Sequence, residues 1–247
     1  METMSHTTHS TSATLRTAIL MSIAVVIIEV AGGIYTGSLA LLSDASHAFS
    51  DLLALTITLF ALHIAGRPST AKHTFGYHRA EVISALLNGL LLLVMAWTIG
   101  SRAFLRLESP PDIQGGLVAI IGFVGIIPNI WTVLRLRKSK NINVKSAALH
   151  ALGDAGASVV VVISGIVIAL TGLTQFDAIA SFIIMALLII GAVRLLKQVL
   201  FILLEGTPPS IDREEISKII CAVPEVQSTH DLHLWTLCSD VVYFTGH

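Results

Sequence analysis

Two pairs of histidine and aspartate, each spaced four residues apart, are the side chains of this 247-residue sequence best suited to chemistry. They are His47 with Asp51 and His150 with Asp154. Residues four apart lie on one face of a helix, so each helix would offer one imidazole nitrogen and one carboxylate oxygen to a common point. Two such helices supply four ligands, which suits tetrahedral zinc and also cobalt(II) or cadmium. The pattern therefore predicts a divalent metal site whose two carboxylates balance the charge of the ion.

Both pairs lie in apolar runs, where a charged group is costly and needs a reason. Unrelated polar contacts within a helix bundle are the alternative, but two copies in two runs favour the metal site. A site closed by four protein ligands could also be purely structural. Asp44, three residues before His47 on nearly the same face, argues against that, because it could support a ligand or carry a proton. Glu29, in the middle of the first apolar run, is predicted to line the pathway or to bond to a neighbouring helix.

The elements that carry these residues are predicted to cross a membrane. Hydrophobic residues make up 54% of the sequence and charged residues only 13%, with a mean hydropathy of +0.81. A transmembrane helix needs about 20 mostly apolar residues. Six segments meet this requirement: 16–36, 39–65, 80–104, 115–136, 146–171 and 177–202.

The basic residues predict the orientation of these spans. Of the 15 Lys and Arg residues, only Arg102 and Arg106 fall at the connections on one side, and the others fall on the opposite side. Cytoplasmic loops collect Lys and Arg, so both termini are expected in the cytoplasm, with residues 1–14 as a disordered cytoplasmic tail. We expect an integral, multi-pass protein of a bacterial plasma (inner) membrane. The scattered basic residues form no stripe for nucleic acid.

Residues 205–247 differ in composition from the apolar runs and are predicted to begin a cytoplasmic C-terminal domain. A helix is expected from Ser210–Asp212 to about Ala222, then strands over 226–237 and 241–245. One helix and two strands bury little core, so we expect either a truncated domain or one completed by a partner. The fold class is therefore an all-α polytopic membrane protein with six transmembrane helices and a partial cytoplasmic α+β domain.

Four motifs, in this order along the chain, resemble those of the cation diffusion facilitator family. The resemblance covers the chain from about residue 15 and implies a six-helix cation efflux domain over 15–204. The matching motifs are Gly37–His47 with Asp51, His73–Glu81, His150 with Asp154, and His230–Trp235.

The resemblance implies a secondary active transporter. It implies proton-coupled antiport by a homodimer that exports Zn²⁺, or also Cd²⁺ or Co²⁺, from the cytoplasm. The site of His47, Asp51, His150 and Asp154 would open alternately to each side. Zinc is then a transported substrate, and no organic cofactor is expected.

The family also has metal sites outside the membrane, and this sequence matches them only in part. In the loop between the second and third spans, His73 matches one ligand and His78 is displaced by one residue. Thr70 and Tyr77 stand where an Asp and a His would be. The family's cytoplasmic domain is ferredoxin-like, with the order α-β-β-α-β, of which α-β-β is present here. His230 and His247 match two of its metal ligands at the dimer interface. We expect at most weak metal binding at these four histidines.

Two other functions are alternatives to transport. An intramembrane metalloprotease would need HExxH, which is absent, and the absence of a P-loop excludes direct drive by ATP, so no enzymatic activity is expected. A non-transporting metal-binding scaffold, or a subunit of a heteromeric transporter, stays as the alternative, because a closed structural site would look the same in sequence.

Overall fold

The structure is a computed structural model that describes residues 3–137, 142–238 and 241–247, with the backbone alone for residues 3–16 and 142–147. The chain divides into two compact units. The first comprises Met1–Leu53 and Leu92–Ile190, and the second comprises Ala54–Leu91 and Gly191–His247. Three helices run from one unit into the other.

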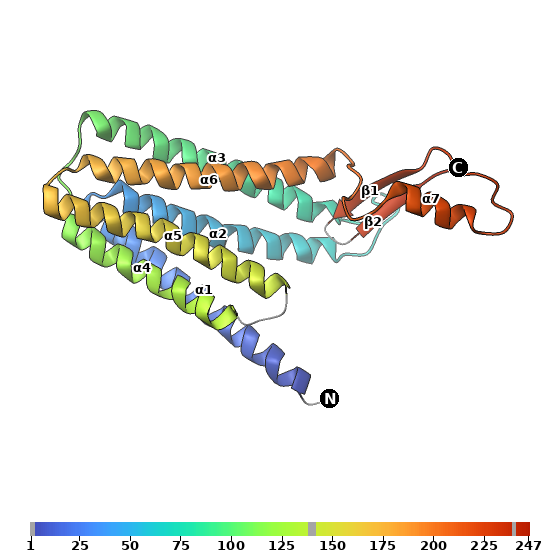
Figure 1. The fold of residues 1–247 in the computed structure, drawn as a ribbon, viewed down its shortest axis with the longest axis horizontal. Coiled ribbons are helices and arrows are strands. Elements are labelled where there is room, and N and C mark those ends of the chain that lie inside the picture. The colour runs from blue at the N-terminus through green and yellow to red at the C-terminus, as the bar shows by residue number, and fades with distance from the viewer. Residues whose placement is uncertain (1–2, 138–141, 239–240) are drawn as a thin grey trace. The chain divides into compact units, whose positions relative to one another are not determined.

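Six of the described helices are long and apolar enough to cross a membrane, which confirms the predicted all-α polytopic fold (Figure 1). Each coincides with one of the six predicted spans, and the largest differences lie at their ends. Exposed large apolar side chains such as Trp97 and Leu170 suit contact with lipid. The six helices are α1 (Thr3–Thr36), α2 (Leu39–Ala65), α3 (Arg79–Glu108), α4 (Gly115–Leu136), α5 (Ile142–Thr171) and α6 (Gln175–Leu203).

Helix α1 begins at Thr3, so its backbone is helical over residues for which the sequence predicted a disordered tail. The many Ser and Thr residues of this stretch are mediocre helix formers, which is why the sequence favoured disorder. Extending an existing helix gains one backbone hydrogen bond for each residue that is fixed, so an apolar helix can continue into a polar stretch. Expectation and structure differ here.

Within the first unit, α4 packs against α5 and also against α1 (Figure 1). Two glycines let the backbones of α4 and α5 meet. A methyl group added at Gly115 would lie 2.6 Å from the backbone nitrogen of Ala169, and one added at Gly165 would lie 2.5 Å from that of Ala119. Small residues at helix contacts are how transmembrane helices pack closely. This packing fixes α5, which carries half of the candidate site.

Helix α2 begins at a buried carboxylate. Asp177, in the first turn of α6, accepts hydrogen bonds from the Ser38 hydroxyl (2.5 Å) and from the Leu39 backbone N–H (2.6 Å). The Arg106 guanidinium, near the end of α3, lies 3.2 Å from the same carboxylate and donates to the Gly37 carbonyl (2.5 Å). The left-handed conformation of Gly37, with φ of 73°, makes the tight link between α1 and α2. This cluster fixes the end of α2 that precedes the site.

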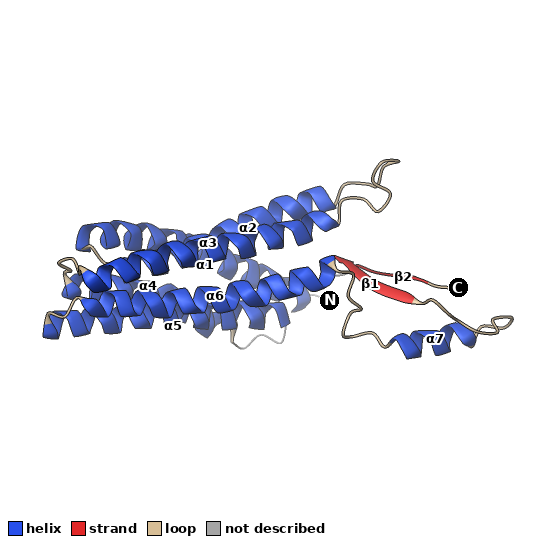
Figure 2. Ribbon diagram, turned by 90° about the horizontal axis from the view of Figure 1, so that it is seen from above, coloured by secondary structure: helices blue, strands red, loops and turns tan. Residues whose placement is uncertain are grey.

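The second unit contains the end of the chain, coloured by element type in Figure 2. Helix α7 (Arg213–Cys221) is capped by Asp212, whose carboxylate accepts from the Glu214 N–H (2.8 Å). Strands β1 (His233–Cys238) and β2 (Val241–Thr245) pair antiparallel, with Trp235 opposite Tyr243. This α-β-β order confirms the predicted start of an α+β domain.

The first strand is shorter than predicted, because residues 226–232 are not strand. Asp231 has a positive φ of 57°, which interrupts an extended backbone at that point. Pairing resumes beyond it, where the backbones of His230 and His247 exchange hydrogen bonds of 2.7 and 2.9 Å. A buried cluster of Val82, Val199 and Cys238 joins the sheet to α3 and α6 within this unit.

Candidate metal site

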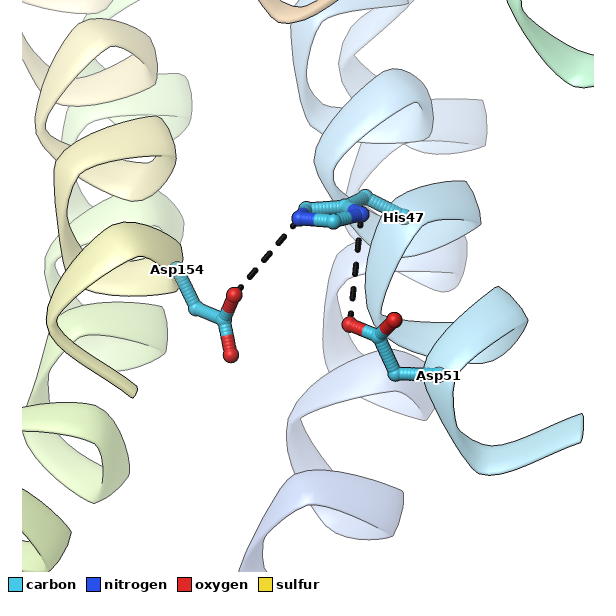
Figure 3. Close-up of side chains that lie close together, drawn as sticks. All are labelled: His47, Asp51 and Asp154. Atoms are coloured by element: carbon cyan, nitrogen blue, oxygen red, sulfur yellow. Dashed lines mark ion pairs between the residues drawn. The ribbon is translucent and has the colours of Figure 1, made fainter. Parts of the chain in front are cut away.

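The two predicted His–Asp pairs face each other across α2 and α5. The imidazole Nε2 of His47 lies 3.5 Å from Oδ1 of Asp154, and its Nδ1 lies 3.9 Å from Oδ2 of Asp51 (Figure 3). His150 completes the arrangement, because its Nε2 lies 3.4 Å from Asp51 and 3.8 Å from Asp154. Each carboxylate therefore lies beside both imidazoles, one on its own helix and one on the other.

The separations between the helices can be compared with those between the ligand atoms of a metal ion. In a tetrahedral zinc site with ligand distances of about 2.0–2.2 Å, neighbouring ligand atoms are about 3.3–3.6 Å apart. The two separations between helices, 3.4 and 3.5 Å, fall in that range, and the two within a helix are slightly wider. His47 Nδ1 and Asp51 Oδ2 are buried without a hydrogen-bond partner among the described atoms. Buried polar atoms rarely stay unpaired, so a cation among them fits the geometry.

The four residues do not converge equally. Single ligand atoms of His47, Asp51 and Asp154 all lie within 4.8 Å of one another. His150 stands outside this group of three, and its side chain is 58% exposed against 21% for His47. His150 is thus the most exposed of the four candidate ligands, since Asp51 is 32% exposed and Asp154 24%.

Asp44 and Glu29 are buried beyond the candidate ligands. Asp44 is 4% exposed and accepts a hydrogen bond from the hydroxyl of Ser158 on α5 (2.7 Å). Glu29, on α1, is 2% exposed, and its Oε1 has no hydrogen-bond partner among the described residues. Asp44 is within electrostatic reach of both Glu29 and His47. Two buried acidic side chains, Asp44 on α2 and Glu29 on α1, thus follow one another from His47.

The four histidines predicted as weak cytoplasmic ligands belong to the second unit of the chain. Among the described residues, none of them belongs to a group of three potential ligands. Nδ1 of His73 lies 3.3 Å from the Tyr77 hydroxyl and its ring stacks on Tyr77, while His78 lies on the same loop. The rings of His230 and His247 stack with centroids 6.1 Å apart. Metal binding at these positions stays a prediction.

Sequence reasoning missed three residues that position the site. The sequence analysis gave Ser158 no role in the site, yet it lies four residues after Asp154 and so on the same face of α5. Asp177 and Arg106 were not recognised as a pair that holds the start of α2. The sequence feature that could have revealed this pair is the position of one acidic and one basic residue near the ends of two apolar runs, on the same side of the membrane.

Comparison with known proteins finds cation efflux proteins over most of the chain. A family model described as the cation efflux transmembrane domain matches residues 15–204, and one described as the cation efflux protein cytoplasmic domain matches residues 208–247. The metal cation efflux system protein CzcD of Cupriavidus metallidurans is 40% identical over 235 residues, which are 94% of this chain and 74% of that protein.

Two further relatives have names that state their substrates. The zinc transporter ZitB of Escherichia coli is 39% identical over 213 residues, covering 85% of this chain and 68% of that protein. The cadmium, cobalt and zinc/H(+)-K(+) antiporter of Bacillus velezensis is 33% identical over 246 residues, covering 98% of this chain and 79% of that protein. All three are transporters rather than enzymes. With its six spans and its cytoplasmic domain, the chain belongs to the cation diffusion facilitator family of cation efflux transporters.

Proposed function

We propose that this protein exports Zn²⁺, and also Cd²⁺ or Co²⁺, from the cytoplasm in exchange for protons, through His47, Asp51, His150 and Asp154. The observation that carries the proposal is the placement of both carboxylates beside both imidazoles, at separations near those of tetrahedral zinc ligands. The substrates printed in the names of ZitB and of the Bacillus antiporter agree with this choice of ions.

The chemistry of the four side chains couples metal to protons. Zinc requires neutral imidazole and ionised carboxylate, so binding displaces any protons that these groups hold. Two carboxylates neutralise the 2+ charge of the ion, which lowers the cost of holding it in the membrane. Protons that arrive from the far side protonate the imidazoles and the carboxylates, which removes the ligands and the negative charge and so releases the metal.

Asp44 and Glu29 are proposed to carry these protons. Both are buried, Asp44 lies within electrostatic reach of His47, and Glu29 lies within electrostatic reach of Asp44. The hydrogen bond from Ser158 ties Asp44 on α2 to α5, so a change in the contact between these two helices reaches Asp44 directly. Protonation of Asp44 would weaken its attraction for a cation at His47.

The protein is proposed to work as a homodimer in a bacterial inner membrane with both termini in the cytoplasm. The excess of Lys and Arg on one side supports this orientation. The match of residues 208–247 to a cytoplasmic domain supports the same side for the C-terminus, and six spans return the chain to it. We propose residues 15–204 as the transport domain and residues 205–247 as part of the cytoplasmic domain.

Zinc flux into vesicles tests this function against the scaffold alternative. The purified protein is reconstituted, a pH gradient is imposed, and internal zinc is followed with a dye in wild type, Asp51→Ala and Asp154→Ala. Gradient-dependent uptake in wild type that disappears in both variants is expected. Zinc bound by wild type without any flux would overturn the proposal in favour of a metal-binding scaffold.

A further inference from the structure

A polar cavity lies in the second unit of the chain, whereas the candidate metal site belongs to the first. It has a volume of about 590 Å³ and lies between the loop that joins α2 to α3, the first turn of α3, Glu205 and strand β1. These elements come together in Figure 1, where the strands lie beside the start of α3. The transport mechanism makes no use of this cavity.

The lining of the cavity is basic. Lys72 and Arg79 line it, His73 and His78 lie beside them, and Glu205 is the only acidic lining residue. The Arg79 Nη2 donates to Glu205 Oε1 at 3.1 Å, which leaves most of the five guanidinium N–H donors for another acceptor. Lys72 has no ion-pair partner among the described residues. Two cations against one carboxylate leave the cavity ready for an anion.

Its position places the cavity at the surface of the membrane. The loop that forms it leaves the apolar helix α2 at Ala65 and enters the apolar helix α3 at Arg79. Lining residues Trp235 and Leu237 belong to the segment that matches a cytoplasmic domain, so the cavity is on the cytoplasmic side. Basic pockets at that level of a membrane protein favour anionic lipid headgroups.

Aromatic side chains beside the cavity also favour a position at the membrane surface. Phe75 is 55% exposed and meets Tyr243 edge to face, with ring centroids 5.2 Å apart. Tyr243 in turn stacks on Trp235 at 6.0 Å. Aromatic rings gather where the acyl region of a bilayer meets water. A basic cavity bordered by an aromatic cluster therefore suits a phosphate headgroup whose chains remain in the bilayer.

We propose that this cavity binds the phosphate group of an anionic phospholipid, held by Lys72 and Arg79. The bound headgroup would join the loop between α2 and α3 to strand β1, because side chains of both line the cavity. Among the described residues the cavity holds no group of three potential metal ligands, so an anion suits it better than a second metal ion. The Glu205 carboxylate repels the anion and so lowers the affinity of the cavity for it.

Fluorescence of Trp235 can report this binding in the full chain. The sequence has three tryptophans, so Trp97→Phe with Trp131→Phe leaves Trp235 as the reporter in purified protein in neutral detergent. The probe is short-chain phosphatidylglycerol, compared with phosphatidylcholine of equal chain length and with soluble glycerol phosphate. A saturable, salt-sensitive response to phosphatidylglycerol alone is expected. An equal response to phosphatidylcholine would overturn the role of charge, and an equal response to glycerol phosphate would assign the cavity to a soluble phosphate instead.

Three variants locate the binding. Lys72→Gln should weaken the affinity for phosphatidylglycerol by about five-fold, since each basic side chain near anionic lipid contributes about that factor. Glu205→Gln should strengthen binding, because it removes the opposing charge and frees Arg79. Arg67→Gln, on the same loop but outside the cavity lining, is the matched control and should change nothing. Unchanged affinity in Lys72→Gln, or an equal loss in Arg67→Gln, would overturn the proposal.

Discussion

Replacing Asp51 with Asn removes one negative charge from the candidate metal site while keeping the shape of the side chain. Oδ2 of Asp51 lies 3.4 Å from Nε2 of His150 and 3.9 Å from Nδ1 of His47, so it is a carboxylate shared by the two helices. With zinc bound, the site is neutral when Asp51 and Asp154 are both ionised. In Asp51→Asn the same site carries one uncompensated positive charge and has lost an anionic ligand.

The expected loss of zinc affinity follows from that charge. Removing one partner of a fully buried charge pair costs about 3–5 kcal/mol. The Asp51 side chain is 32% exposed, so water offsets part of this cost and the lower end of the range applies. At about 1.4 kcal/mol for each factor of ten, about 3 kcal/mol corresponds to a dissociation constant for zinc raised about 100-fold.

Titration of purified protein with zinc, in competition with a chelating dye, measures this constant. Asp112→Asn, in the loop between α3 and α4, makes the same chemical change outside the candidate site and should bind zinc as wild type does. A change in Asp51→Asn below about five-fold, which is about 1 kcal/mol, would refute the assignment of Asp51 as a ligand. An equal loss in Asp112→Asn would refute the reasoning from local charge.

Three further outcomes are expected. Ser158→Ala loses the hydrogen bond to Asp44 and should lower the free energy of unfolding by about 1–2 kcal/mol in denaturant titrations. Ser164→Ala on the same helix is the control and should not lower it, because the Ser164 hydroxyl is buried without a partner among the described atoms. Equal losses in the two variants would contradict this prediction. Asp177→Asn leaves the Arg106 charge without its partner and should destabilise the fold by about 3 kcal/mol, measured in the same way, and wild-type stability would contradict the role given to this pair. The dissociation constant for zinc should rise as the pH falls from about 7.5 to about 6, because protons compete for imidazole and carboxylate; a constant value over this range would argue against these ligands.

The sequence predicted the six spans because each is a long apolar run with its charges at the ends. It also predicted that His47 and Asp51 share one face of α2, since their spacing fixes the position of one side chain relative to the other on the same helix. Spacing cannot give the rotation of one helix against another. For that reason the exposure of His150, and the contact of Ser158 with Asp44, could be seen only in the structure.

The start of α2 and the first strand show two other limits of sequence reasoning. The contact of Asp177 with Ser38 joins residues that are 139 positions apart, and no local pattern marks a contact of that kind. The predicted strand over 226–237 rested on apolar and β-branched residues, but the positive φ of Asp231 interrupts it, and Asp tolerates that conformation better than most residues. Backbone conformation at single residues is a property that composition does not reveal.

Zinc-driven counterflow of protons tests the central claim most directly. Zinc is added outside vesicles that contain the protein, with equal pH on both sides and the membrane potential clamped. Internal zinc and internal pH are then recorded together. Exchange predicts that the internal pH rises as zinc enters, and that neither signal appears in Asp51→Ala or Asp154→Ala. Zinc entry in wild type with an unchanged internal pH would contradict proton exchange, and full counterflow in either variant would contradict the site.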